Sequence, residues 1–324
     1  MRRGTLLFLP MILSACMSSR FSYKAASTPV KKSDSTISIP ANAQYNKISK
    51  LNRFLLGEHF RKEWATSVEV EILNLDSLPE KLTPTRMGGG NQTKSLRLES
   101  DNGREYVLRS INKDPSKALP AEFVGTFADA IVQDQISSSN PYAPLMVAEL
   151  AGVAGIFHTT PKIVFVEKAT RLGEFNEVFA NSMALFEERP SGDQVPNVAF
   201  DFAKRIINSE NLFQNIFEDK DYQVDGMAFL KARLFDMWIG DWDRHEDQWV
   251  WAAFKSGDKT IYKPIPRDRD QAFAKLDGLL PQIAARKWAV RRTQNFDYTI
   301  RDIFGLNMSG NAIDRLFTTE LTWQ

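Results

Sequence analysis

The stretch that ends at Gly240 carries hydrophobic residues at the spacing of an amphipathic helix. Five of them fall three or four positions apart or side by side: Met227, Leu230, Leu234, Met237 and Trp238. A helix with this pattern buries one stripe of its surface, and a glycine is a common place for it to end. We therefore expect a helix that packs through this stripe and stops at Gly240.

A polar loop follows, and then the pattern changes to that of a β-hairpin. Residues 248–254 and 260–265 are rich in aromatic and β-branched side chains, and the residues between them, KSGD, favour a turn. If the turn centres near Gly257, Gln248 and Asp268 lie at the same open end of the hairpin. We expect Asp243, in the preceding loop, to converge with them.

Elsewhere the chain alternates between strand-like and helix-like patterns, which predicts an α+β protein. Strands are expected at 67–73, 95–98, 106–111, 162–167 and 178–186, and helices at 47–64, 145–155 and 201–217. The segment EERPSGD at 187–193 is rich in charge, proline and glycine. We expect a hinge there between an amino-terminal part, 44–190, and a carboxy-terminal part, 191–324.

Carboxylates gathered at one end of a hairpin repel one another unless a cation compensates them. Oxygen ligands favour Mg²⁺ or Mn²⁺, and magnesium usually combines one or two carboxylates with water and substrate phosphates. The group Asp243, Gln248 and Asp268 therefore indicates metal-dependent phosphoryl chemistry. The alternative is that Asp241, Asp243 and Asp247 cap a helix and lie on a loop. Arg267 and Arg269 would then simply pair with Asp268 and Asp270.

The motif GDWDRHEDQ, followed by a hairpin and RDRDQAF, resembles the catalytic and metal-binding segments of the atypical protein-kinase-like enzymes. These are the HipA kinases, the spore-coat CotH kinases, the secretory-pathway casein kinases and the phosphatidylinositol kinases. The resemblance implies a bilobal fold, with a small β-rich lobe and a larger, mostly helical lobe. It implies ATP or another nucleotide as donor and Mg²⁺ or Mn²⁺ as cofactor.

The same resemblance assigns roles to the residues that match the motif. Asp243 stands at the catalytic position, with Arg244 and His245 shaping the loop, and Gln248 stands at a metal-binding position. Asp268 matches the second metal-binding aspartate best, and Asp270 is a rival because the D-x-D repeat leaves the register ambiguous.

The amino-terminal part carries candidates for nucleotide binding. The triplet Gly88, Gly89 and Gly90 precedes a predicted hairpin, as the nucleotide-covering loop of kinases does, and such glycines let backbone N–H groups approach phosphates. Arg109 stands where these kinases carry a phosphate-binding lysine, and Lys113 is the alternative. By resemblance, Glu149 on the predicted helix at 145–155 would hold that cation, and adenine would stack near 185–188, which includes Glu187.

The first sixteen residues read as a lipoprotein signal peptide, because a basic start and a short apolar run lead to LSAC at Cys16. The resemblance to a lipobox implies lipidation of Cys16 and a bacterial cell-envelope location, anchored in the membrane on the periplasmic or outer-membrane face. A chance cysteine after an ordinary signal peptide is the alternative. Residues 17–43 are rich in Ser, Lys, Thr and Pro and are expected to form a flexible tether.

Composition and charge argue against a nucleic-acid partner. The chain has a formal net charge of +1, and no basic clustering marks a nucleic-acid-binding face, so we expect no nucleic-acid partner. The expected partners are a nucleotide and an acceptor, which the sequence leaves open between protein, glycan and lipid.

Three functions compete on the sequence. The leading one is a kinase-like phosphotransferase of the cell envelope. A nucleotide-binding pseudokinase scaffold is the second, because Arg109 and Gln248 depart from common kinase patterns. A metal-dependent phosphoesterase ranks third, since such sites need several histidines and the chain has three.

Overall fold

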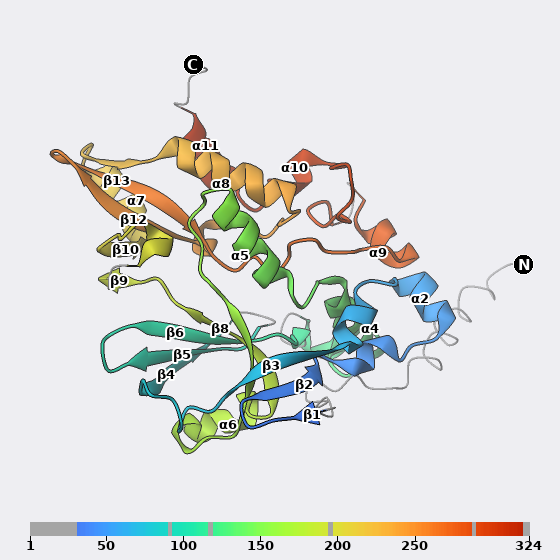
Figure 1. The fold of residues 1–324 in the computed structure, drawn as a ribbon. Helices are drawn as coiled ribbons and strands as arrows, with labels where there is room; N and C mark the ends of the chain where they lie inside the picture. The colour runs from blue at the N-terminus through green and yellow to red at the C-terminus, as the bar shows by residue number, and fades with distance from the viewer. Residues whose placement is uncertain (1–30, 90–92, 116–118, 194–196, 287–289, 320–324) are drawn as a thin grey trace, which may run out of the picture.

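The structure is a computed structural model that describes residues 31–89, 93–115, 119–193, 197–286 and 290–319. It is an α+β fold with two β-sheets, as the mixed pattern predicted (Figure 1). One sheet comes from the amino-terminal part of the chain and the other from the carboxy-terminal part. Cys16, and with it the predicted signal peptide, lies outside the described residues.

The larger sheet has eight strands in the order β1-β2-β3-β7-β8-β6-β5-β4. Only β3 and β7 pair in parallel, and the other neighbours are antiparallel. The strands are β1 (Lys31–Lys32), β2 (Thr36–Pro40), β3 (Ser67–Leu73), β4 (Leu82–Gly88), β5 (Ser95–Ser100), β6 (Glu105–Ser110), β7 (Lys162–Val166) and β8 (Ser182–Glu188).

The prediction of a tether over 17–43 is wrong at its carboxy-terminal end. Strand β2 pairs with β3 along its whole length, and its Ile37 and Ile39 are 2% exposed in the core. The TISIP sequence alternates as a strand should, but the surrounding Ser and Lys residues hide this in the composition. Residues 17–30 lie outside the described part of the chain.

The smaller sheet has five strands in the order β11-β13-β12-β10-β9. Its centre is the predicted hairpin, in which Trp249 pairs with Pro266 at the open end. The helix expected over 201–217 is wrong in its first half, because residues 205–208 form a strand that pairs with β12. The strands are β9 (Gly192–Asp193), β10 (Arg205–Asn208), β11 (Tyr222–Val224), β12 (Trp249–Ser256) and β13 (Lys259–Pro266).

The single helix predicted over 47–64 is broken into α2 and α3 at Gly57. That residue has φ of +120°, and a Cβ there would lie 2.3 Å from the His59 ring, so the turn requires glycine. The α-helices are α2 (Lys50–Leu56), α3 (Arg61–Ala65), α4 (Phe127–Gln135), α5 (Ala143–Val153), α6 (Asn176–Phe179), α7 (Ser209–Glu218), α8 (Gly226–Trp238), α9 (Leu279–Ala284), α10 (Ile303–Leu306) and α11 (Asn311–Thr318). The first residues of the strand predicted over 178–186 belong to helix α6 instead, and the strand, β8, begins only at Ser182.

Helix α8 ends before Gly240 as predicted, but it buries a different face. Met227, Leu234 and Trp238, from the predicted stripe, are 64%, 55% and 59% exposed. The buried positions are Phe229, Ala232, Arg233, Phe235 and Asp236. Two charged residues occupy the buried face because they pair with other charged groups there, and a hydrophobicity pattern cannot detect that.

Helix α5 joins the two halves of the fold. It lies in the chain between β6 and β7 of the larger sheet, yet its Ala143, Val147 and Ala151 belong to the core of the carboxy-terminal half, with Phe229 of α8 and Trp251 of β12. In Figure 1 it stands between the two sheets. Within the described residues, no helix is both long and apolar enough to span a membrane.

Candidate functional site

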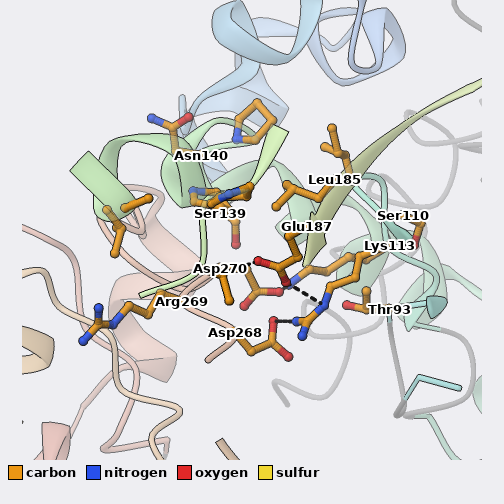
Figure 2. A pocket seen from close by; sticks show the side chains of 18 of the residues that line it. Thr93, Ser110, Lys113, Ser139, Asn140, Leu185, Glu187, Asp268, Arg269 and Asp270 are labelled. Carbon is orange, nitrogen blue, oxygen red and sulfur yellow. Dashed lines mark hydrogen bonds and ion pairs between the residues drawn. The ribbon is translucent and has the colours of Figure 1, made fainter. Parts of the chain in front are cut away.

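A pocket lies between the larger sheet and the loop that follows β13 (Figure 2). The sheet contributes Arg109 and Glu187, and Lys113 follows β6 directly. The loop contributes Asp268 and Asp270 from the opposite side. Apolar side chains complete the wall, among them Ile111, Ile136, Val147 and Leu185. Charged groups from segments about 160 residues apart therefore meet in one partly apolar cavity.

Two ion pairs cross this pocket. Arg109 Nη1 lies 2.5 Å from Asp268 Oδ1, and Lys113 Nζ lies 2.5 Å from Asp270 Oδ2. Arg109 Nε also lies 3.5 Å from Glu187 Oε1, and Glu187 accepts a hydrogen bond of 2.5 Å from the Thr159 hydroxyl. The Asp268 and Asp270 side chains remain 32% and 27% exposed, so a ligand can reach their oxygens.

Arg244 connects the Asp243 loop to the Asp268 loop. Its guanidinium is fully buried and donates hydrogen bonds to the backbone carbonyls of Gln248, at 3.1 Å, and of Arg267. The backbone N–H of Arg267 in turn donates to the Gln248 carbonyl at 2.9 Å. The two polar loops that the hairpin prediction placed at one end are therefore joined there through Arg244.

Asp236 of α8 anchors this arrangement from the helix. It is 0% exposed. Its carboxylate lies 3.1 Å from Arg244 Nε, 3.0 Å from Arg269 Nε and 3.3 Å from Arg233 Nη1. Three guanidinium groups around one buried carboxylate compensate its charge, and the arrangement fixes Arg269 between Asp268 and Asp270.

Backbone geometry sets the direction of the Asp268 side chain. Asp268 has φ of +55°, a left-handed conformation that aspartate tolerates better than most residues. Phe273 has φ of +61°, and its N–H donates to the Ile239 carbonyl at 2.8 Å. Left-handed non-glycine residues often cluster at functional sites, and here both follow the same hairpin.

The charges of the site shift the pKa values of its acids in opposite directions. Burial alone would raise the pKa of Asp268, but Arg109 and Lys113 outweigh this and hold it below its usual range. For Asp270, burial and the nearby Asp268 charge outweigh Lys113 and raise the pKa. Burial also raises the pKa of Asp241 to about 6, against the opposing effect of Arg244. Asp268 is thus the acid that stays ionised most readily.

The other predicted site residues in the two loops make few contacts with one another. Asp243 is half-buried, and its carboxylate forms no hydrogen bond or ion pair with any described residue; its N–H donates to Asp241 Oδ1 at 3.4 Å. The Gln248 amide lies 3.4 Å from His245 Nε2 rather than beside Asp268. The convergence of these residues is therefore found in the backbone of the two loops and not in direct side-chain contacts.

The glycine triplet lies at the end of β4. Gly88 is the last residue of that strand, and Gly89 has φ of +116°, where a Cβ would lie 2.0 Å from the Thr93 carbonyl oxygen. Gly89 therefore fits a tight turn that other residues cannot adopt. Gly90 lies outside the described residues.

The predicted partnership of Glu149 is wrong. Glu149 is exposed on α5, and no contact joins it to Arg109 or Lys113 within the described part of the chain. Glu187 of β8 holds Arg109 instead, and Asp270 holds Lys113. The buried face of α5 consists of Ala and Val residues packed in the core, which turns Glu149 outward.

Sequence reasoning missed Asp236 and the buried position of Arg233. Both lie inside the helix that was predicted from its apolar residues alone. The sequence does contain one indication of this ion pair, because Arg233 and Asp236 stand three residues apart on the same face of a helix. That spacing is too common on exposed helices to identify a buried network.

The donor set suits a magnesium or manganese ion that arrives with a phosphate ligand. Asp268 and Asp270 offer two hard carboxylates, and Mg²⁺ completes such sites with water and phosphate oxygens. Among the residues that the structure describes, no group of three or more His, Cys, Asp or Glu side chains could hold a metal by itself. The pocket thus fits a shared metal site better than a closed protein site.

Comparisons of the chain with protein families, with curated proteins and with solved structures find no match.

Proposed function

We propose that the protein is a kinase-like phosphotransferase that uses a nucleotide and Mg²⁺ or Mn²⁺. The observation that carries the proposal is the charge arrangement of the pocket. Arg109 on the larger sheet and Lys113 just after strand β6 face Asp268 and Asp270 on the opposite loop. Phosphoryl transfer requires cations that hold phosphates and carboxylates that hold a metal on those phosphates, in one cleft.

Burial makes the two cations of the pocket depend on anionic partners. Arg109 is 13% and Lys113 9% exposed as side chains, so both cations are largely removed from water and need an anionic partner. A triphosphate supplies anionic oxygens to the cations and frees the carboxylates. The bound ion would then neutralise charge on the transferred phosphoryl group.

In this proposal the two sheets belong to two lobes of a kinase-like architecture, with the pocket between them. The support is that the larger sheet contributes the cations, and the segments around the hairpin contribute the acids. Asp268 and Asp270 would hold the metal with Gln248, and Glu187 orients Arg109.

Asp243 is the candidate that orients or deprotonates the acceptor hydroxyl. Its carboxylate is half-buried and unpaired among the described residues, which leaves it available to a substrate proton. Arg244 is a positioning residue, because its side chain ties the backbone after Asp243 to the backbone before Asp268.

A nucleotide-binding scaffold without turnover is the second candidate. It is favoured because the Gln248 amide contacts His245 and forms no hydrogen bond with Asp268, the other proposed metal ligand, among the described residues. A dimetal phosphoesterase is not proposed. His59 bonds to the Ser137 hydroxyl, His158 to the Thr159 carbonyl and His245 to Gln248, so the three histidines serve different parts of the fold.

The test is consumption of γ-labelled ATP by the full chain with Mn²⁺ or Mg²⁺, followed as phosphate transferred to protein or to water. Asp243→Asn and Asp268→Asn should each lower the rate by about 100-fold or more, since catalysis depends on positioning and on charge neutralisation. The matched control is Asp247→Asn, an exposed acid in the same loop. Equal rates in all four proteins would refute the assignment, and ATP binding without turnover would support the scaffold.

The location in a bacterial cell envelope, with a lipid on Cys16, stays a prediction from the sequence. The acceptor is proposed as a hydroxyl compound, and its class stays open between protein, glycan and lipid.

A further inference from the structure

Arginines gather on one face of the larger sheet. In β5, Leu96 and Leu98 are fully buried on the opposite face, so Arg97 between them points to this side. The same alternation places Arg109 of β6 and Glu187 of β8 on that side, since Leu108 and Phe186 pack with Leu96 and Leu98. The register aligns Arg97 with Val107 and Val107 with Glu187.

Two further arginines border this face. Arg189 follows Glu187 by two residues. Its guanidinium pairs with the Glu105 carboxylate, and its backbone N–H donates to the Glu105 backbone carbonyl at 2.8 Å. Arg267 precedes Asp268 on the opposite loop. Arg97, Arg189 and Arg267 are all half-buried. We call these three residues the arginine group.

The arginine group has too few carboxylates for its charge. Glu105 pairs with Arg189, whereas Arg97 and Arg267 have no hydrogen-bond or ion-pair partner for their side chains within the described residues. Burial and the positive charge of Arg189 lower the pKa of Arg97. Like charges on half-buried side chains are costly unless an anion joins them.

We propose that the arginine group is a second phosphate-binding subsite, which holds a phosphate group in addition to the triphosphate chain at Arg109 and Lys113. Guanidinium groups suit this task because their planar N–H forks bind phosphate oxygens in pairs. The inference rests on the proposed function, and it adds the chemistry of the substrate: one of the two substrates carries a further phosphate monoester. That group belongs either to the acceptor or to the ribose of the donor.

The first arm of the test uses inorganic pyrophosphate as the probe for a separate phosphorylated molecule. It is titrated calorimetrically into the full chain saturated with a non-hydrolysable Mg·ATP analogue. The second arm compares the affinity for Mg·ATP with the affinity for the same nucleotide carrying a ribose 3′-phosphate. Binding in the first arm assigns the subsite to the acceptor, and at least about tenfold tighter binding in the second assigns it to the donor.

Variants make the result specific to the arginine group. Arg97→Gln and Arg267→Gln should each weaken, by about tenfold, the probe binding that the wild type shows in the positive arm. Both should leave the affinity for plain Mg·ATP within about twofold of the wild type. The control is Arg315→Gln, which removes the same charge from an exposed position on α11. If Arg97→Lys recovers part of the probe binding that Arg97→Gln loses, a positive charge at residue 97 is needed for that binding.

The proposal is overturned if both arms are negative, or if both glutamine variants respond to the probes as the wild type does. Failure of the proposed function looks different, because then Mg·ATP itself does not bind. In that case pyrophosphate is titrated into the protein alone. Binding that depends on Arg97 and Arg267 would keep the anion subsite without the phosphotransferase, and its absence would remove both.

Discussion

Arg109 of β6 and Asp268 of the loop after β13 form an ion pair with 2.5 Å between Nη1 and Oδ1. The pair joins the larger sheet to the segment that follows the hairpin of the smaller one. The charges that the proposed activity needs therefore also hold these two parts of the fold together.

The first prediction concerns the energy of this pair. A double-mutant cycle of Arg109→Gln and Asp268→Asn should give a coupling free energy of about 0.5–2 kcal/mol, because the aspartate side chain is one-third exposed and solvent screens the attraction. Urea unfolding of the wild type, both single variants and the double variant measures it. Strict additivity of the two single effects would show that the pair does not stabilise the fold.

The second prediction concerns Asp236. Replacing it with alanine leaves Arg233, Arg244 and Arg269 without their shared buried carboxylate, and we expect a loss of about 3–5 kcal/mol in the free energy of unfolding. Denaturant unfolding measures the loss. Asp258→Ala, at an exposed position in the hairpin turn, is the control and should stay within about 0.5 kcal/mol. Similar stabilities for the two variants would contradict the network.

The third prediction concerns the two faces of α8. Phe229 is 0% exposed and packs on Trp249 with ring centres 5.1 Å apart, whereas Leu234 is 55% exposed. Phe229→Ala should lower the free energy of unfolding by about 3–5 kcal/mol, and Leu234→Ala should lower it by less than about 1 kcal/mol. The same unfolding measurement applies to both. A larger loss in Leu234→Ala than in Phe229→Ala would mean that α8 buries the face that the sequence pattern predicted.

The fourth prediction is a pH dependence of stability. The pKa of Asp241 is raised from its ordinary value of 3.8 to about 6 in the folded protein. A raised pKa means that the folded state binds the proton more tightly than the unfolded state does. The contribution of protonated Asp241 to the free energy of unfolding is therefore fully present below about pH 4 and is lost as the pH rises through about 6. Asp241→Asn removes the titration. The difference in unfolding free energy, wild type minus variant, should therefore fall between about pH 4 and about pH 6.5 and then level off. A difference that stays constant over this range, or that rises, would contradict the raised pKa.

The hairpin and its neighbouring loops could be predicted from the sequence because their signals are local. Aromatic and β-branched runs flank KSGD, and the pairing of Trp249 with Pro266 follows from the position of the turn. The meeting of Gln248 and Arg267 at the open end follows from the same register. Arg109 and Lys113 were identified as the candidate cations through the resemblance to kinases, because Arg109 stands where those enzymes carry a phosphate-binding lysine and Lys113 is the alternative.

The partners of those cations could not be predicted, because they depend on long-range packing. Glu149 looked suitable on a helix, but the core requires the Ala and Val face of α5 and leaves the glutamate outside. Asp236 and Arg233 were hidden because a periodicity argument counts charged residues as exposed. Strand β2 was hidden because a short strand in a Ser- and Lys-rich stretch has the composition of a linker.

The proposed function requires that the pocket between Arg109, Lys113, Asp268 and Asp270 binds a metal–nucleotide complex. The decisive measurement is calorimetric titration of the full chain with Mn·ATP. Lys113→Met removes one phosphate-binding charge, and Lys259→Met, at an exposed lysine in the hairpin, is the control. We expect one binding site per chain, at least about tenfold weaker binding in Lys113→Met and unchanged binding in Lys259→Met. Absence of binding by the wild type, or equal binding by all three proteins, would contradict it.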